Sequence, residues 1–315
     1  MADFRFSLFA VTLCAIILAP SPSPAQPAPA PAESATGTGT RSRDVIKRFV
    51  ASFATPTHMT GKIARWEDGI CPLTVGQQPA VTKFVTQRVK DVAAMVGAPV
   101  NVMQSCTPNI EIVFTKLPQE LLDNVREHQV EYLGYAQSGA QLEKLATVTR
   151  PVQAWYTTQT KDRHGMSRID SALRTGEGIA MPCFTCLGRG GPTEYLPDAT
   201  YASVSGDHIS DGVRSVFYHI IIVADINRLN GYEAGPLADY VAMLALAQLN
   251  SLDTCQELPS IENMLAKGCE AKTGELTGND IAYLRGLYGM SPDRMLLATQ
   301  MSEIADRMSQ TLGGQ

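Results

Sequence analysis

Apolar residues in the first half of the chain follow helical spacing in some stretches and strand spacing in others. In residues 79–96 they recur every three or four positions, which predicts a helix with one buried face. In residues 109–115 apolar and polar residues alternate, which is typical of a strand with one buried face. A second amphipathic helix is predicted after Pro118, and a further strand at residues 152–158.

The second half of the chain contains the longest apolar runs. Residues 159–212 are polar and glycine-rich and are expected to form loops and insertions. Residues 216–224 (VFYHIIIVA) are β-branched or aromatic and predict a strand. Residues 237–249 are apolar on nearly every side and predict a helix at the centre of the fold. Thr277 is expected to cap a further helix, and a last amphipathic helix is predicted at residues 292–312.

The N-terminus has the pattern of a signal peptide. Arg5 precedes an apolar run at residues 6–19, and Ser23-Pro24-Ala25 offers the small residues that a signal peptidase reads. A membrane span needs about 20 apolar residues, so we expect cleavage after Ala25 and no transmembrane anchor afterwards. Residues 26–43 are rich in Pro and Ala and predict a disordered linker, and residues 44–315 predict a single domain. The protein is therefore expected to be exported, either to the periplasm or out of the cell.

The charge balance excludes two classes of partner. The chain has 26 Lys and Arg against 31 Asp and Glu, a formal net charge of -5, and no basic run. Binding to nucleic acid or to an anionic membrane requires a basic patch or stripe. We therefore expect neither as a main partner.

Six cysteines remain after removal of the signal peptide, and an even number in an exported chain predicts disulfides. The sequence alone leaves the connectivity open. We expect neighbours to pair: Cys71 with Cys106, Cys183 with Cys186, and Cys255 with Cys269. The C-x-x-C spacing of the middle pair also occurs in thiol exchange and in zinc sites, but a glycine-rich loop follows it and no second ligand pair is present. A structural disulfide is therefore preferred.

Three segments of the second half carry a recognisable set of motifs. Residues 238–246 read ADYVAMLAL, residues 260–264 read SIENM, and residues 276–289 read LTGNDIAYLRGLYG. These segments resemble the catalytic domain of metzincins, the matrixin-like zinc peptidases, which have HExxHxLGL, SIMxP and LTxxDIxxIxxLYG in the same order. The third match is the closest. The resemblance covers residues 216–289 by motif and the preceding part only by the order of elements.

The resemblance implies a zincin-like α+β fold. Such a fold has a mixed twisted sheet, a buried helix of the active-site type and a helical C-terminal subdomain. We place the sheet and helix part at residues 44–235 and the helical part at residues 236–315.

The resemblance also implies that the metal site is lost. Ala238, Ala242 and Gln248 stand where the family has its zinc-binding histidines, and alanine has no lone pair to donate. Asp239 stands in place of the glutamate base, but it has no metal-bound water to activate. We interpret it as a carboxylate in the first turn of a helix, where it favours the helix dipole. No two of the five histidines have the i, i+4 spacing of helical zinc ligands, and no GxSxG elbow is present. We therefore predict no catalytic residue, no metal and no other cofactor.

Three functions remain open for such a pseudoenzyme. In a working peptidase of this family the edge strand beside the cleft pairs with an extended substrate, and strand addition needs no metal. Strand 216–224 would be that edge strand, with Phe217, His219 and Ile221, and the site would lie between it and helix 237–249. The first hypothesis is therefore an exported non-catalytic protein that binds a peptide or protein. The second is an exported hydrolase with an unrecognised catalytic site, and the third is a structural envelope protein whose cleft is filled by apolar side chains.

Overall fold

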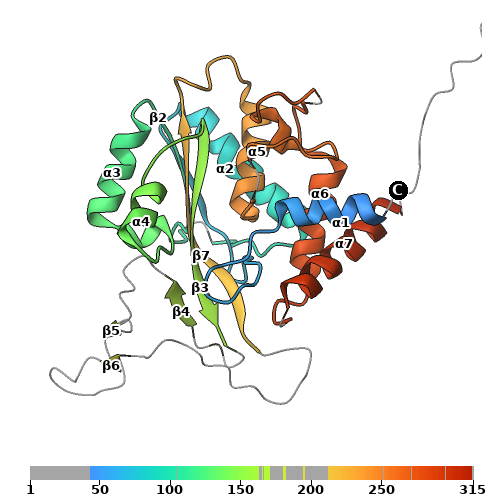
Figure 1. Ribbon diagram of the computed structural model, residues 1–315. Helices are drawn as coiled ribbons and strands as arrows, with labels where there is room; N and C mark the ends of the chain where they lie inside the picture. Colours follow the sequence, from blue (N-terminus) through green and yellow to red (C-terminus); the bar gives the residue numbers. More distant parts are fainter. Residues whose placement is uncertain are drawn as a thin grey trace, which may run out of the picture. The chain divides into compact units, whose positions relative to one another are not determined.

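A mixed five-stranded sheet organises the chain (Figure 1). The computed structural model describes residues 43–103, 105–162, 165, 167–170, 180–181, 194–195, 212–250, 252–270, 272–294 and 296–313. In spatial order the strands are β1 (Pro72–Val75), β2 (Ile110–Thr115), β7 (Arg214–Asp225), β3 (Val152–Lys161) and β4 (Ser167–Asp170). Two short strands, β5 (Ala180–Met181) and β6 (Glu194–Tyr195), pair with each other. The predicted α+β class with a mixed sheet is confirmed.

Strand β7 lies in the middle of the sheet, so the prediction that residues 216–224 form an edge strand is wrong. It pairs with β2 in parallel on one side and with β3 in antiparallel fashion on the other. Ile220 and Ile222 are buried in one apolar cluster, whereas Ile221 and Val223 are buried in another on the opposite face. A strand covered on both faces is apolar without interruption, which is the physical reason for the run of isoleucines.

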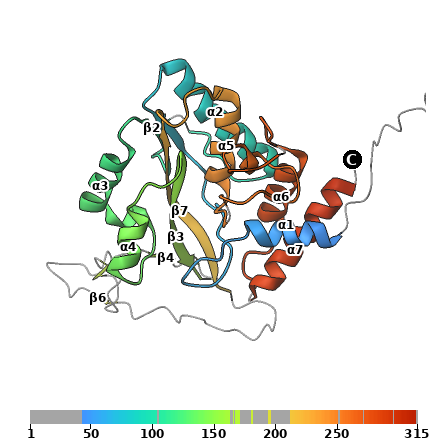
Figure 2. The same cartoon turned by 45° about the horizontal axis from the view of Figure 1, so that its top comes forward.

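Helices cover both faces of the sheet (Figures 1 and 2). The larger apolar cluster joins one face to α1 (Arg43–Phe53), α2 (Pro79–Val96), α5 (Ala234–Leu246), α6 (Gly278–Gly289) and α7 (Leu297–Gly313). The smaller cluster joins the other face to α3 (Pro118–His128), the 3-10 helix η1 (Val130–Leu133) and α4 (Gly139–Leu145). None of the helices among the described residues is long and apolar enough to cross a membrane.

Helix α5 is the central helix that the sequence predicts. Every residue from Leu237 to Leu246 is buried, in agreement with its apolar character on all sides. It begins at Ala234 and ends at Leu246, earlier than predicted at both ends, and Ala247 continues in extended backbone with φ -144° and ψ 139°. After the helix, Leu249 forms an isolated antiparallel bridge with Ala54, the residue that follows α1.

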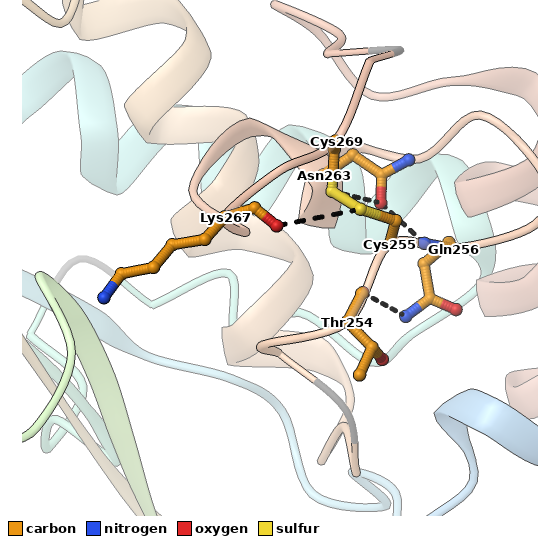
Figure 3. Close-up of a disulfide and its surroundings, with 6 residues drawn as sticks. All are labelled: Thr254, Cys255, Gln256, Asn263, Lys267 and Cys269. Atoms are coloured by element: carbon orange, nitrogen blue, oxygen red, sulfur yellow. Dashed lines mark hydrogen bonds between the residues drawn. A yellow bond between two sulfur atoms is a disulfide. The ribbon is translucent and has the colours of Figure 1, made fainter.

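The segment after α5 is held by a disulfide and by a helix cap. Cys255 and Cys269 are joined, and the Gln256 N–H donates to Asn263 Oδ1 at 2.8 Å within the closed loop (Figure 3). The loop includes the 3-10 helix η2 (Ile261–Met264). Thr277 and Asp280 form a capping box at the start of α6, which confirms the predicted cap.

Two of the three predicted disulfides are confirmed. Cys71–Cys106 ties the start of β1 to the segment before β2, and Cys255–Cys269 closes the loop after α5. Cys183 and Cys186 lie outside the described residues.

Candidate functional site: a groove along strand β3

The positions that correspond to the zinc ligands do not come together at a site. Ala238 and Ala242 are fully buried in the larger apolar cluster, so the helix face that would carry histidines packs against the core. Among the described residues no group of three or more His, Cys, Asp and Glu side chains could hold a metal ion. Gln248, beyond the end of α5, lines one cavity, and Asp239 lines a separate one beside Arg88. The helix therefore serves packing.

Asp239 is a structural partner of α2. Its Oδ1 forms an ion pair with Arg88, and its Oδ2 accepts the Leu276 N–H at 3.0 Å. The Asp239 side chain is 6% exposed. Because α5 begins at Ala234, Asp239 lies in the second turn and not in the first, where a carboxylate acts on the helix dipole. Asp239 therefore does not act on the helix dipole as expected. It joins α5 to α2 through Arg88 and to the chain before α6 through Leu276.

The three residues predicted to bind a peptide from strand 216–224 are engaged inside the molecule. Phe217 packs against Trp66 and Tyr156 with ring centroids 5.5 and 5.6 Å apart. His219 stacks on Tyr132 at 4.1 Å, and its Nε2 lies 3.3 Å from Glu111 Oε1.

The contact with His219 lowers the pKa of Glu111. Ile221 belongs to the smaller apolar cluster. Strand β2 pairs with β7 from Ile220 onward, and the Phe217 N–H donates to the Arg65 carbonyl at 3.1 Å, so the edge that was predicted to bind a peptide is occupied within the molecule.

A groove of about 550 Å³ lies along β3 instead. We call it the β3 groove. Three segments that are far apart in the sequence form it: the chain after α1, the stretch from η1 to β3, and the chain after α5. Its lining consists of Pro56, Thr57, His58, Leu133, Gly134, Tyr135, Gln141, Lys144, Leu145, Thr147, Thr149, Arg150, Gln153, Ala154, Trp155, Tyr156, Thr158, Gln248, Leu249 and Leu252. The groove therefore joins β3 to the end of the helix that resembles an active-site helix.

The register of β3 determines which of its backbone groups face the groove. The Asp225 N–H donates to the Pro151 carbonyl at 2.8 Å, so in this antiparallel pair the odd-numbered residues up to Thr157 bond to β7. The N–H and C=O groups of Ala154 and Tyr156 consequently point away from β7. Strand β4 pairs with β3 only from Thr158 onward. Within the described part of the chain no backbone hydrogen bond uses the N–H or C=O of Ala154.

The open edge of β3 has defined ends. At one end Gly134 approaches the strand: a Cβ atom there would lie 2.6 Å from the Tyr156 carbonyl oxygen, and its φ is +90°. Only glycine allows this approach. At the other end Arg150 precedes the strand. The open edge thus covers residues 152–156, about 16 Å at roughly 3.3 Å per residue.

Strand β3 is anchored to α5 behind the groove. The Tyr156 hydroxyl donates to the carbonyls of Leu244 and Ala247, at 2.9 and 3.1 Å, where the helix ends. Burial raises the pKa of Tyr156 well above its ordinary value, so the hydroxyl stays neutral and remains a donor. The carbonyls that a helix end leaves unpaired are thereby satisfied, and the edge is held in place.

Beneath α5 lies Glu262, the residue of the SIENM turn that stands where the metzincin motif has methionine. It is 1% exposed, and neither carboxyl oxygen has a hydrogen bond of normal geometry, although the Tyr240 side chain lies close enough to interact with it. Burial raises its pKa well above the ordinary value, and the negative charge of Asp280 adds to this effect. Interaction with the Tyr240 side chain and the positive charge of Arg150 both lower the pKa of Glu262, but by less. Burial therefore favours the protonated form of this carboxyl.

Comparisons of the chain with protein-family models, with curated proteins and with solved structures give no match.

Proposed function

We propose that this chain is an exported, non-catalytic protein of metzincin-like fold that binds an extended peptide along the β3 groove. The observation that carries the proposal is the open edge of β3, which presents the N–H and C=O of Ala154 to a cavity. An unpaired strand edge is a template for a further strand, and backbone hydrogen bonds supply the affinity. The sequence analysis assigned peptide pairing to residues 216–224, and the proposal assigns it to β3 instead.

Contacts between two motif segments support the metzincin-like part of the proposal. The Asp280 carboxylate accepts from the Ser260 hydroxyl at 2.6 Å and from the Ile261 N–H at 3.0 Å. One residue of the LTGND motif thus fixes the SIENM turn. The turn lies against α5, and the family's turn lies beneath the metal that its active-site helix binds. Burial raises the pKa of Asp280, and these hydrogen bonds oppose that rise.

The absence of histidines at positions 238 and 242 supports the non-catalytic part. Zinc catalysis needs three protein ligands and an open position for water, and those helix positions carry buried alanines. The two disulfides support export, because such bonds persist in oxidising compartments.

The test is affinity selection on the immobilised protein from a library of extended pentapeptides, read by mass spectrometry. Ala154→Pro removes the outward N–H without removing a bond to β7, since proline is tolerated on an edge facing solvent. We expect selected peptides to bind the unchanged protein and Ala154→Ser, which retains the N–H, but to be lost from Ala154→Pro. Equal binding to all three proteins would refute strand addition at β3. Thermal melting of each variant confirms that the fold is intact.

A further inference from the structure

The charged side chains among the described residues that line the β3 groove are cationic, and Asp253 pairs with one of them, Arg150, from outside the lining. Lys144 and Arg150 line the groove, and none of the described lining residues is Asp or Glu. This differs from the chain as a whole, which has a formal net charge of -5. A ligand that enters the groove therefore gains from carrying a carboxylate.

Arg150 is the cation placed at the end of the open edge. Its own backbone N–H and that of Thr149 donate to Gln153 Oε1, at 3.2 and 2.8 Å, so the turn before β3 is fixed by a side chain of the strand. The Arg150 side chain is 30% exposed. A guanidinium held in this way is prearranged for the two parallel hydrogen bonds that a carboxylate accepts.

A carboxylate of the protein itself occupies this position. Arg150 Nε donates to Asp253 Oδ1 at 3.1 Å, and Nη2 donates to Oδ2 at 2.5 Å. Asp253 comes from the chain after α5 and its side chain is 73% exposed. An ion pair with such an exposed partner contributes little to stability. A second carboxylate can therefore replace Asp253 at small cost.

Charge also sets the direction of a bound strand. A peptide parallel to β3 would bring its N-terminal ammonium toward Arg150, whereas an antiparallel peptide brings its carboxyl end there. Strand β4 already pairs with β3 in the antiparallel sense further along.

From this geometry we propose that Arg150 is a carboxylate subsite, which holds the C-terminal carboxylate of a short peptide paired antiparallel to β3 and which Asp253 occupies in the free protein. The inference rests on the proposed function, since it assigns an end and a direction to the peptide that β3 would bind.

The experiment compares two pentapeptide libraries of equal composition, one ending in a free carboxylate and one in a carboxamide, on the full-length protein and its variants. We expect enrichment of the free acids, with affinities roughly tenfold above those of the amides, because hydrogen bonds to charged groups are the stronger class. Arg150→Gln should remove the preference. Asp253→Asn should tighten binding of the acids up to about fivefold, since the competing surface ion pair is gone.

The matched control is Arg126→Gln, which breaks the ion pair of Arg126 on α3 with Glu143 on α4, two residues that do not line the groove. It should leave the preference unchanged. Peptides that bind equally as acids and as amides would overturn the subsite and leave the proposed function standing. No enrichment from either library would overturn both. If Arg150→Gln does not fold, Asp253→Asn still tests the subsite, because it retains Arg150 and removes only the competing carboxylate.

Discussion

Replacing Glu262 with methionine removes a buried carboxyl that has no hydrogen bond of normal geometry. The residue is 1% exposed, and neither carboxyl oxygen has a hydrogen bond of normal geometry. Methionine is similar in length and has no group that needs a partner. It is also the residue that the metzincin turn has at this place. The substitution therefore tests whether the carboxyl stabilises or destabilises the turn.

The expected size of the effect follows from the cost of an unsatisfied buried polar group, about 1–3 kcal/mol. Glu262→Met should raise the free energy of unfolding by about that amount. For a domain of this size each kcal/mol shifts the melting temperature by about 2–4 °C.

The sign of the pH dependence is fixed by the raised pKa of Glu262 in the folded protein. Below the pKa of the unfolded chain, Glu262 is protonated in both the folded and the unfolded state, and its ionisation does not lower the free energy of unfolding. Between the two pKa values only the folded state retains the proton, so stability falls as the pH rises. The advantage of Glu262→Met over the unchanged protein should accordingly grow with pH above about 4.3, the ordinary pKa of Glu.

Urea unfolding followed by tryptophan fluorescence measures both effects, because Trp66 and Trp155 are buried. Glu262→Gln is the matched control: it cannot ionise and should lose the pH dependence while it keeps a polar group in the site. A loss of more than about 1 kcal/mol in Glu262→Met would refute the reasoning, since it would mean that the carboxyl makes a stabilising hydrogen bond.

Three further predictions concern the scaffold. Joint replacement of Cys255 and Cys269 by serine should lower the free energy of unfolding by about 3 kcal/mol, as expected for a closed loop with a sequence separation of 14, and denaturant titration measures this. Histidines introduced together at Ala238 and Ala242 should destabilise the core by about 1–3 kcal/mol through overpacking, and elemental analysis should find no stoichiometric zinc. Asp239→Ala should cost about 1–3 kcal/mol in thermal unfolding, because the Leu276 N–H and Arg88 lose their acceptor.

Elements with local periodicity could be predicted from the sequence. The predicted helix at residues 79–96 has the bounds of α2, because one face of it is buried at regular spacing. The strand at residues 109–115 agrees with β2, in which buried and partly buried residues alternate. The cap at Thr277 is also a local feature. By contrast, the short α4 has no buried residue and hence no apolar stripe to mark it.

Strand pairing could not be predicted, because neighbours in a sheet are chosen by non-local contacts. The resemblance placed residues 216–224 at an edge, but they pair with β3 on one side, and on the other side they pair with β2 from Ile220 onward. The run of isoleucines was a usable signal, since strands buried on both faces are continuously apolar. Strand β3 alternates less regularly and includes Gln153 and Thr157, which is more typical of a strand that is partly open.

The site was the least predictable part. Arg150 and Asp253 are 103 positions apart in the sequence, and no motif relates them. The groove combines three segments whose proximity depends on the whole sheet. Of the four active-site-helix positions named from the sequence, only Gln248 belongs to it, because alanines that replace ligands pack into the core.

Amide hydrogen exchange read by NMR, with and without a selected peptide, tests strand addition at β3 most directly. Peptide binding should slow exchange of the Ala154 and Tyr156 amides, which point away from β7, while the Gln153 and Trp155 amides, already bonded to β7, should change little. Unchanged exchange at Ala154 and Tyr156 in the presence of a bound peptide, with protection at another surface, would contradict the account.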